Sequence, residues 1–296
     1  MDVVRMSVNS LLPRLRALLA LISRNARSLL KSRNVVIVYL LFNLKSLPLM
    51  WHLRTFRTVM RRITDPAPGK YLTPRCLFLP TVSSTRAPWL ECDYNMHKSN
   101  STYFSDIDMS RGNLTLVLFC KPWNPFPGPN HMAMVLGSCS CVWRKEIKPY
   151  EQYELWSRVV SWDEKWVYVV THFVEKGRYA HREYVLQPSR KPSKKKKSEP
   201  KEPIKAVYAS AISRYVVKNN RRTVPPEDAI RLCGLLPPRD PEDARGAGSP
   251  TFEEMDRIRQ KNLPIVQLRQ GWDAVHSLFE GDESAALGRY MDFMGC

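Results

Sequence analysis

Residues 92 to 111 read CDYNMHKSNSTYFSDIDMSR, a run of polar and charged side chains that passes into a helical pattern. Apolar residues then recur at the spacing of one helix face, at Tyr103, Ile107, Leu114 and Leu118. The residues suited to cap the first turn are Asn100, Ser101 and Thr102. The pattern predicts a helix over residues 100–119, with Gly112 as a candidate break.

Strand-like segments surround this helix. A short apolar run at Arg75–Val82 precedes it, and longer runs rich in β-branched and aromatic residues follow it, at 133–147, 153–162, 165–175 and 206–217. The sequence WDEKW at 162–166 predicts the turn of a hairpin. One early helix followed by an antiparallel meander predicts an α+β fold, with helix layered on sheet.

The order Asp93, His97, Asn100, Tyr103 resembles the motif Asp-x-x-Gly-His-x-Asn-Asn-x-x-Tyr. That motif opens the central helix of hotdog thioesterases of the 4-hydroxybenzoyl-CoA thioesterase type. The variant DYNMH at 93–97, and YELWSRVVSWDEKW at 153–166, are similar to the group of thioesterase superfamily member 6 and its fungal relatives. The resemblance covers roughly residues 75–235 and the N-terminal arm. It implies a hotdog fold, in which a curved antiparallel sheet wraps a central helix.

The residue types in this motif suit attack on a thioester. A carboxylate just ahead of a helix, here Asp93, can serve as general base or nucleophile. The amides at the helix start favour negative charge and suit an oxyanion hole. His97 would orient water or the thioester, Asn100 would position the carbonyl, and substrate binding is assigned to Ser101 and Tyr103. The structural alternatives are helix capping by Asp93 or Asn100 and a buried, satisfied His97.

The resemblance implies a thioesterase that hydrolyses an acyl-CoA or acyl-carrier thioester in lipid or secondary metabolism, without cofactor or metal, as a homodimer. Two positions depart from the family motif. Met96 stands where the family has glycine, so positive φ is costly there, and Ser99 replaces the first asparagine. These departures favour an alternative, a non-catalytic hotdog protein that binds acyl ligands or forms a membrane scaffold.

The first 64 residues form a basic arm. They contain twelve lysines and arginines but one acid, Asp2. Ser7–Lys31 predicts a basic amphipathic helix, Val35–Trp51 is an interrupted apolar run, and His52–Arg62 predicts a second basic amphipathic helix. We expect an intracellular, membrane-associated protein, at the endoplasmic reticulum or mitochondrion. Mitochondrial import and a soluble helical arm are the alternatives.

The remaining segments suggest connections and additions to this domain. DPAPGK at 65–70 is a linker, so we place the hotdog domain at 70–236, with a disordered Lys-rich insertion at 187–203. The C-terminal extension, residues 237–296, predicts helices at 251–261, 270–279 and 283–293. The net charge of +18 is concentrated in the arm and the insertion, which argues against a nucleic-acid partner. Seven irregularly spaced cysteines favour free thiols over disulfides or zinc.

Overall fold

The computed structural model describes residues 32–119, 132–179, 181–190, 203–239, 250–281 and 284–292, together with positions 13, 16 and 20. The chain divides into two compact units, Met1–Pro48 and Leu49–Cys296. In the first unit, α2 spans Ser32–Phe42. The amphipathic helix expected over Ser7–Lys31, and most of the Lys-rich insertion, lie outside the described residues.

The second unit is built on one large sheet. Its strand order is β2 (Met132–Trp143), β6 (Val207–Asn219), β4 (Val167–Glu175), β3 (Gln152–Trp162), β1 (Thr81–Arg86) and β9 (Gly288–Met291), with β7 (Arg222–Val224) beside β6. All neighbours pair antiparallel except β1 and β9, which are parallel. The four strands expected after the helix are therefore confirmed. β5 (Glu183–Tyr184) and β8 (Ala285–Ala286) form a separate parallel pair.

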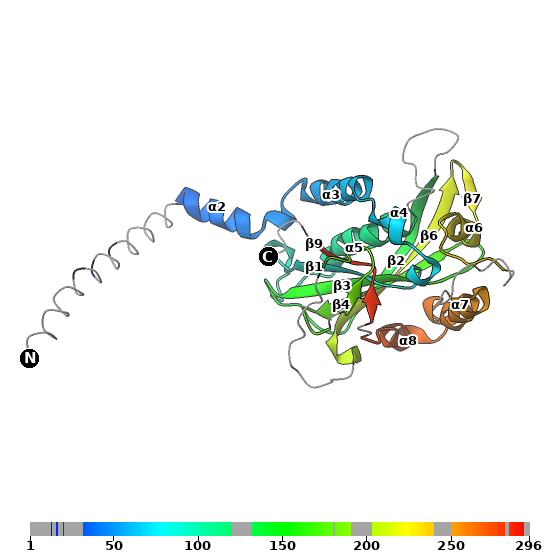
Figure 1. Cartoon of the computed structure of the whole chain (residues 1–296). Coiled ribbons are helices and arrows are strands. Elements are labelled where there is room, and N and C mark those ends of the chain that lie inside the picture. Colours follow the sequence, from blue (N-terminus) through cyan, green and yellow to red (C-terminus); the bar gives the residue numbers. More distant parts are fainter. Residues whose placement is uncertain are drawn as a thin grey trace, which may run out of the picture. The chain divides into compact units, whose positions relative to one another are not determined.

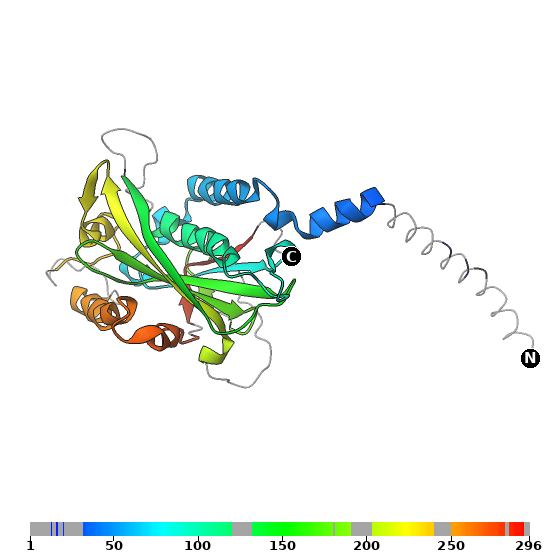
Figure 2. The same cartoon turned by 180° about the vertical axis from the view of Figure 1, so that it is seen from behind.

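Helix α5 (Thr102–Leu118) is the central helix, and it lies on one face of the sheet (Figures 1 and 2). Its side chains Leu114, Val117 and Leu118 pack with Val159 and Val169 of β3 and β4 in one hydrophobic cluster. The expected helix thus exists, but Gly112 does not break it. A Cβ at that glycine would lie 3.6 Å from Thr58 of α3 (Met50–Thr64), an ordinary contact distance, so α3 packs beside α5 at this point.

The opposite face of the sheet carries the C-terminal helices α7 (Phe252–Val266) and α8 (Gly271–Ser277) (Figures 1 and 2). Val160, Tyr168, Val170 and Ile212 pack against them. Because neighbouring residues in β3 and β4 point to opposite faces, these strands are buried on both sides. Thr251 begins α7, the helix expected at 251–261, with a capping box in which its hydroxyl accepts the Glu254 N–H at 3.2 Å.

Two sequence expectations about elements are wrong. The first strand begins at Thr81 rather than Arg75. Pro74–Cys76 forms a 3-10 turn instead, and Leu77 is buried in the hydrophobic cluster beneath α5. The helix expected over 283–293 is replaced by β8 and β9. β9 forms because its backbone pairs with β1, a partner two hundred residues away in sequence that local periodicity cannot reveal.

Helix α3, which we expected within the basic arm, belongs to the second unit, since that unit begins at Leu49. The helix itself is as predicted, covering the basic amphipathic stretch His52–Arg62. Two short helices complete the unit, α4 (Ala67–Tyr71) in the Pro/Gly linker and α6 (Pro226–Leu232) after the sheet. The α+β class is confirmed, with one central helix against an antiparallel-dominated sheet.

Candidate active site

A short hairpin carries the segment between β1 and α5. Cys92 and Lys98 pair as an antiparallel bridge, and inside that pair the Asp93 N–H donates to the His97 carbonyl over 3.0 Å. The Met96 N–H donates to the Asp93 carbonyl, also over 3.0 Å, and Met96 has a left-handed φ of 62°. A turn followed by a left-handed residue is a common three-residue hairpin loop. The loop brings Asp93 and His97 together at its two ends.

Asp93 and His97 form the candidate catalytic pair. Nδ1 of His97 lies 3.8 Å from Oδ1 of Asp93, and the two side chains are 23% and 27% exposed, respectively. The same carboxylate oxygen accepts the Asn95 N–H at 2.9 Å, which fixes its orientation as in an Asx-turn. A carboxylate beside an imidazole can take a proton from water, and partial exposure leaves both groups open to a substrate.

Glu146 is a third titratable group beside this pair. Its Oε1 lies 4.0 Å from Nε2 of His97, and its side chain is 71% exposed. The next residue, Ile147, accepts the Lys98 N–H through its carbonyl at 2.8 Å, so the main chain holds Glu146 next to the hairpin. Sequence reasoning missed Glu146 because it lies far from the motif in sequence, at the end of the segment that follows β2.

The start of α5 does not use the expected cap. Ser101 occupies the N-cap position, and its side chain makes no capping hydrogen bond. The Thr102 hydroxyl donates to the Ser99 carbonyl at 2.7 Å, and Oγ of Ser99 lies 3.3 Å from Oγ of Ser101. The capping alternative for Asn100 is therefore wrong. Asn100 and Ser101 are both exposed, so their side chains are accessible to a bound substrate.

Tyr103, assigned to substrate binding from the sequence, lies in the core beneath the hairpin. Its side chain is 1% exposed, and its ring contacts Phe173 and Trp143, with centroids 4.8 Å and 5.9 Å away. Burial raises the pKa of its hydroxyl above the ordinary value. The ring packs under the first turn of α5 and does not face solvent.

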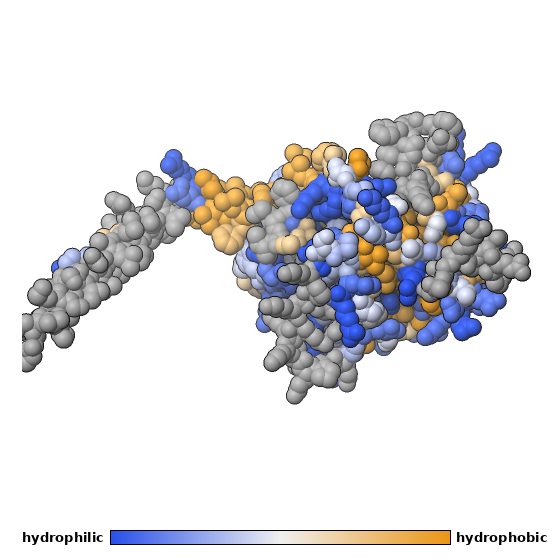
Figure 3. All heavy atoms as spheres, viewed as in Figure 1, coloured by the Kyte–Doolittle hydropathy of each residue, from blue (hydrophilic) through white to orange (hydrophobic). Residues whose placement is uncertain are grey.

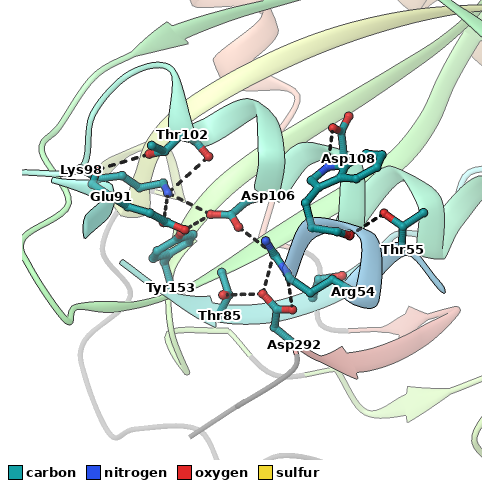
Figure 4. Close-up of polar contacts among 12 residues, drawn as sticks. Arg54, Thr55, Thr85, Glu91, Lys98, Thr102, Asp106, Asp108, Tyr153 and Asp292 are labelled. Carbon is teal, nitrogen blue, oxygen red and sulfur yellow. Dashed lines mark hydrogen bonds and ion pairs between the residues drawn. The ribbon is translucent and has the colours of Figure 1, made fainter. Parts of the chain in front are cut away.

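A buried network of charges lies directly behind the hairpin (Figure 4). The fully buried ammonium of Lys98 lies 2.5 Å from Glu91 and 3.0 Å from Asp106, and the Tyr153 hydroxyl donates to the same Asp106 carboxylate. Burial alone would lower the pKa of Lys98, but Asp106 and Glu91 outweigh it and raise that pKa above its ordinary value. Lys98 is therefore a permanent cation one residue after His97.

The network continues into α3 and the end of the sheet. Arg54 of α3 lies 2.9 Å from Asp106 and 2.6 Å from Asp292, and the Thr85 hydroxyl donates to Asp292 at 2.9 Å. Figure 4 shows Asp106 between Lys98 and Arg54, with Asp292 beyond Arg54. Segments far apart in the sequence thus meet behind the site. Sequence reasoning missed the network, because each member resembles an ordinary surface charge until its distant partners are known.

Known proteins are similar to this chain in sequence. A family model described as the thioesterase-like superfamily matches residues 87–231, a range that includes the hairpin, α5 and β2 to β6. The probable thioesterase atnL of Emericella nidulans is 37% identical over 288 residues, which cover 87% of this chain and 91% of atnL. The chain belongs to the thioesterase-like superfamily. The thioesterase poxG of Penicillium oxalicum is 35% identical over 273 residues, or 86% of this chain and 89% of poxG.

A solved structure is also similar to this thioesterase-like chain. It is a 4-hydroxybenzoyl CoA thioesterase mutant in complex with 4-hydroxybenzoyl CoA, with 13% identity and a TM-score of 0.34 over 51% of this chain and 96% of that one. The family assignment itself rests on the sequence relatives. The resemblance expected from the motif is confirmed, and the matched range contains every site residue predicted from it, from Asp93 to Tyr103.

Proposed function

We propose that this thioesterase-like protein hydrolyses the thioester of an acyl-CoA or acyl-carrier substrate at the Asp93–His97 pair. One observation carries the proposal: a hairpin holds the Asp93 carboxylate 3.8 Å from the His97 imidazole, immediately before the central helix. The relatives named as thioesterases support the reaction class. We include in the proposal a role in lipid or secondary metabolism. The acyl chain that the protein accepts would distinguish between these two roles.

The chemistry follows from the placement of these groups. Asp93 accepts a proton from water as the water oxygen bonds to the thioester carbonyl carbon, and His97 orients that water. Amides at the start of α5 stabilise the resulting oxyanion. The C–S bond then breaks, and the thiolate takes up the proton as the acid leaves. In a covalent variant of the same route, Asp93 attacks the carbonyl carbon itself and the C–S bond breaks to release the thiolate. Water then hydrolyses the mixed anhydride, which releases the acid and restores Asp93.

Substitution of Asp93 tests the proposal. We expect Asp93→Asn to lower kcat/KM on a panel of purified acyl-CoAs by about 10²- to 10⁴-fold, because asparagine cannot accept the proton. Asn retains an oxygen for the Asn95 N–H, so the hairpin should persist. Asp163→Asn is the matched control, since Asp163 accepts the Lys165 and Trp166 N–H groups at 2.9 and 2.7 Å in an equivalent turn away from the site. Equal activity of Asp93→Asn and wild type would overturn the proposal.

A second candidate is an acyl-binding protein without turnover. Two observations favour it: Met96 replaces the family glycine at a left-handed position, and the Asp93 carboxylate already serves the turn by accepting the Asn95 N–H. Equilibrium binding of a non-hydrolysable acyl-CoA thioether separates the candidates. If wild type and Asp93→Asn both bind the thioether tightly and neither hydrolyses the thioester of the same acyl chain, the protein is an acyl-binding protein without turnover.

We also propose that the protein acts as a homodimer. Among the described strands, β2 pairs with β6 along one side only and forms an edge of the large sheet. Val135, Leu136 and Trp143 on this strand are exposed apolar side chains. A long apolar edge strand exposes backbone donors and acceptors that a second strand can pair with. The edge of a second copy would satisfy them.

A further inference from the structure

Helix α3 packs on the domain with its polar side. Arg54 is 4% exposed and bound to Asp106 and Asp292. One turn or two further along, Thr58 lies against Gly112 of α5, and Arg61 donates to Asn113 at 3.0 Å. The Arg61 guanidinium also lies 4.9 Å from the centre of the Tyr290 ring. Apart from the buried Met50 in its first turn, the side of α3 that faces the protein is therefore held by polar side chains.

The outer side of α3 is apolar. Five large apolar residues recur every three or four positions, which places them on one helix face: Leu49, Leu53, Phe56, Met60 and Ile63. They are between 38% and 70% exposed, and we call them the α3 stripe. Figure 3 shows apolar surface along this helix. A surface helix normally buries its apolar face, so this orientation is inverted, and a contiguous exposed patch of this kind marks an interaction surface.

The preceding helix narrows the choice of partner. In α2, all eight residues from Val35 to Phe42 are large and apolar, and each is between 37% and 61% exposed. A protein groove would cover one side of such a helix, whereas a helix that is apolar all round requires an apolar medium on all sides. Of the helices in the described part of the chain, none is both long and apolar enough to cross a bilayer.

The charges around the α3 stripe fit anionic lipid. Arg57 is exposed and lies beside the stripe, and residues 1–64 carry twelve basic residues against one acid. Basic residues that flank an apolar helix face attract anionic headgroups and extend toward them, while the apolar side chains enter the acyl boundary. An acidic protein surface would match the arginines but would leave the stripe and α2 in water.

We propose that α3 lies in the headgroup region of an anionic bilayer, with the α3 stripe immersed and Arg54 and Arg61 fixing the helix to the domain. This inference is independent of the proposed hydrolysis. Because Arg54 shares Asp106 with Lys98, the docked helix and the Asp93–His97 hairpin are joined by one buried network. The domain would then sit on the membrane in one orientation, instead of swinging from a flexible tether.

Fluorescence quenching tests the position of α3 in the full-length chain. Vesicles contain phosphatidylserine and brominated phosphatidylcholine, in which bromine on the acyl chains quenches nearby tryptophan. We expect Phe56→Trp to add fluorescence that these vesicles quench, beyond the quenching of wild type. Ile258→Trp is the control, because Ile258 is an exposed apolar residue of α7, on the far side of the sheet (Figures 1 and 2). Its added fluorescence should remain unquenched.

Vesicle sedimentation tests the energetic contribution of the stripe. We expect Leu53→Glu with Phe56→Glu to weaken partitioning of the full chain onto phosphatidylserine vesicles by about tenfold or more, since two apolar side chains leave the bilayer. Ile258→Glu with Leu268→Glu adds the same charge at exposed apolar positions elsewhere, and this control should not weaken partitioning. Two results would overturn the proposal. In the first, the chain sediments with vesicles but the Phe56→Trp fluorescence is not quenched. In the second, the tryptophan introduced by Phe56→Trp becomes shielded from solvent without vesicles as the protein concentration rises, which would mean that protein covers the stripe.

Discussion

At Met96 the backbone has a φ of 62°, a left-handed conformation that costs a residue with a Cβ about 1–2 kcal/mol. The strain falls within the hairpin that joins Asp93 to His97. Strained backbone conformations cluster at functional sites, so the left-handed Met96 suggests that this residue has a role in the site. Met96 is 53% exposed, so its thioether lies at the surface of the site and not in the core.

Met96→Gly should therefore stabilise the protein. Glycine removes the left-handed strain, while its greater freedom in the unfolded chain offsets part of the gain. We expect a net gain of about 0.5–1 kcal/mol in the free energy of unfolding, measured by urea denaturation. If Met96 also narrows access to the pair, kcat/KM on acyl-CoAs rises in the same variant. A loss of stability would show that Met96 packs against something that glycine cannot replace.

Lys98 offers a second prediction for a single residue. Lys98→Met leaves Glu91 and Asp106 buried without their shared cation, and breaking a buried pair costs about 3–5 kcal/mol. Chemical denaturation measures this loss. Lys165→Met removes the same charge from an exposed turn and should change stability by less than about 0.5 kcal/mol. Similar small losses in both variants would mean that the network is not a stabilising unit.

Single elements differ in how well the sequence predicts them. α5 and the four long strands follow from local periodicity, and α7 follows from its capping box. β9 and Asp292 do not, because their partners β1 and Arg54 lie more than two hundred residues away. For α3 the periodicity predicts an amphipathic helix but not which face turns inward. The inward face is set by Asp106 and Asp292, which the helix meets only in the folded state.

The same distinction applies to the candidate site. The motif predicts that Asp93 and His97 act together ahead of the helix, but the hairpin that brings them together is seen only in the structure. Spacing could not predict that Glu146 lies beside the site or that the Lys98 side chain turns inward to Asp106, because tertiary packing determines both. Local motifs therefore identify the reacting groups, whereas the groups that hold them in place require the fold.

Between the sheet and α8, two histidines make stability depend on pH. His172 of β4 and His276 of α8 both approach the Ser210 hydroxyl, at 2.8 and 2.6 Å. Burial lowers the pKa of His172 well below its ordinary value and that of His276 to about 4. Below about pH 6.5 the unfolded chain binds protons at these side chains and the folded chain does not, so stability falls as the pH drops.

His172→Gln should flatten this pH dependence. We expect the wild-type free energy of unfolding to decrease by about 1.4 kcal/mol per pH unit through His172 between pH 6 and pH 5, and the variant to lose that part of the slope. Urea denaturation at three pH values measures it. His52→Gln, at an exposed position of α3, is the control and should keep the wild-type slope. An unchanged slope in His172→Gln would mean that His172 is charged when folded.

At the scale of the whole molecule, assembly through the β2 edge can be measured directly. Light scattering on the purified chain should give the mass of a dimer, twice 34.3 kDa. Leu136→Lys places a charge on the edge, where charged residues discourage strand pairing, and should shift the mass toward the monomer. Leu232→Lys changes an exposed residue of α6 and should leave the dimer intact. A wild-type monomer at micromolar concentration would contradict the proposal.

The pairing of β9 with β1, and of Asp292 with Arg54, sets an order of events during synthesis. The ribosome completes α2, α3, the hairpin and α5 long before it adds β9 and Asp292. Until then Arg54 has only Asp106 as its carboxylate partner in the network, and β1 lacks one neighbour. The helix proposed to meet the lipid is therefore made early, and Asp292, which anchors it through Arg54, is made near the end. A nascent chain would thus present this helix to lipid before the second unit is complete.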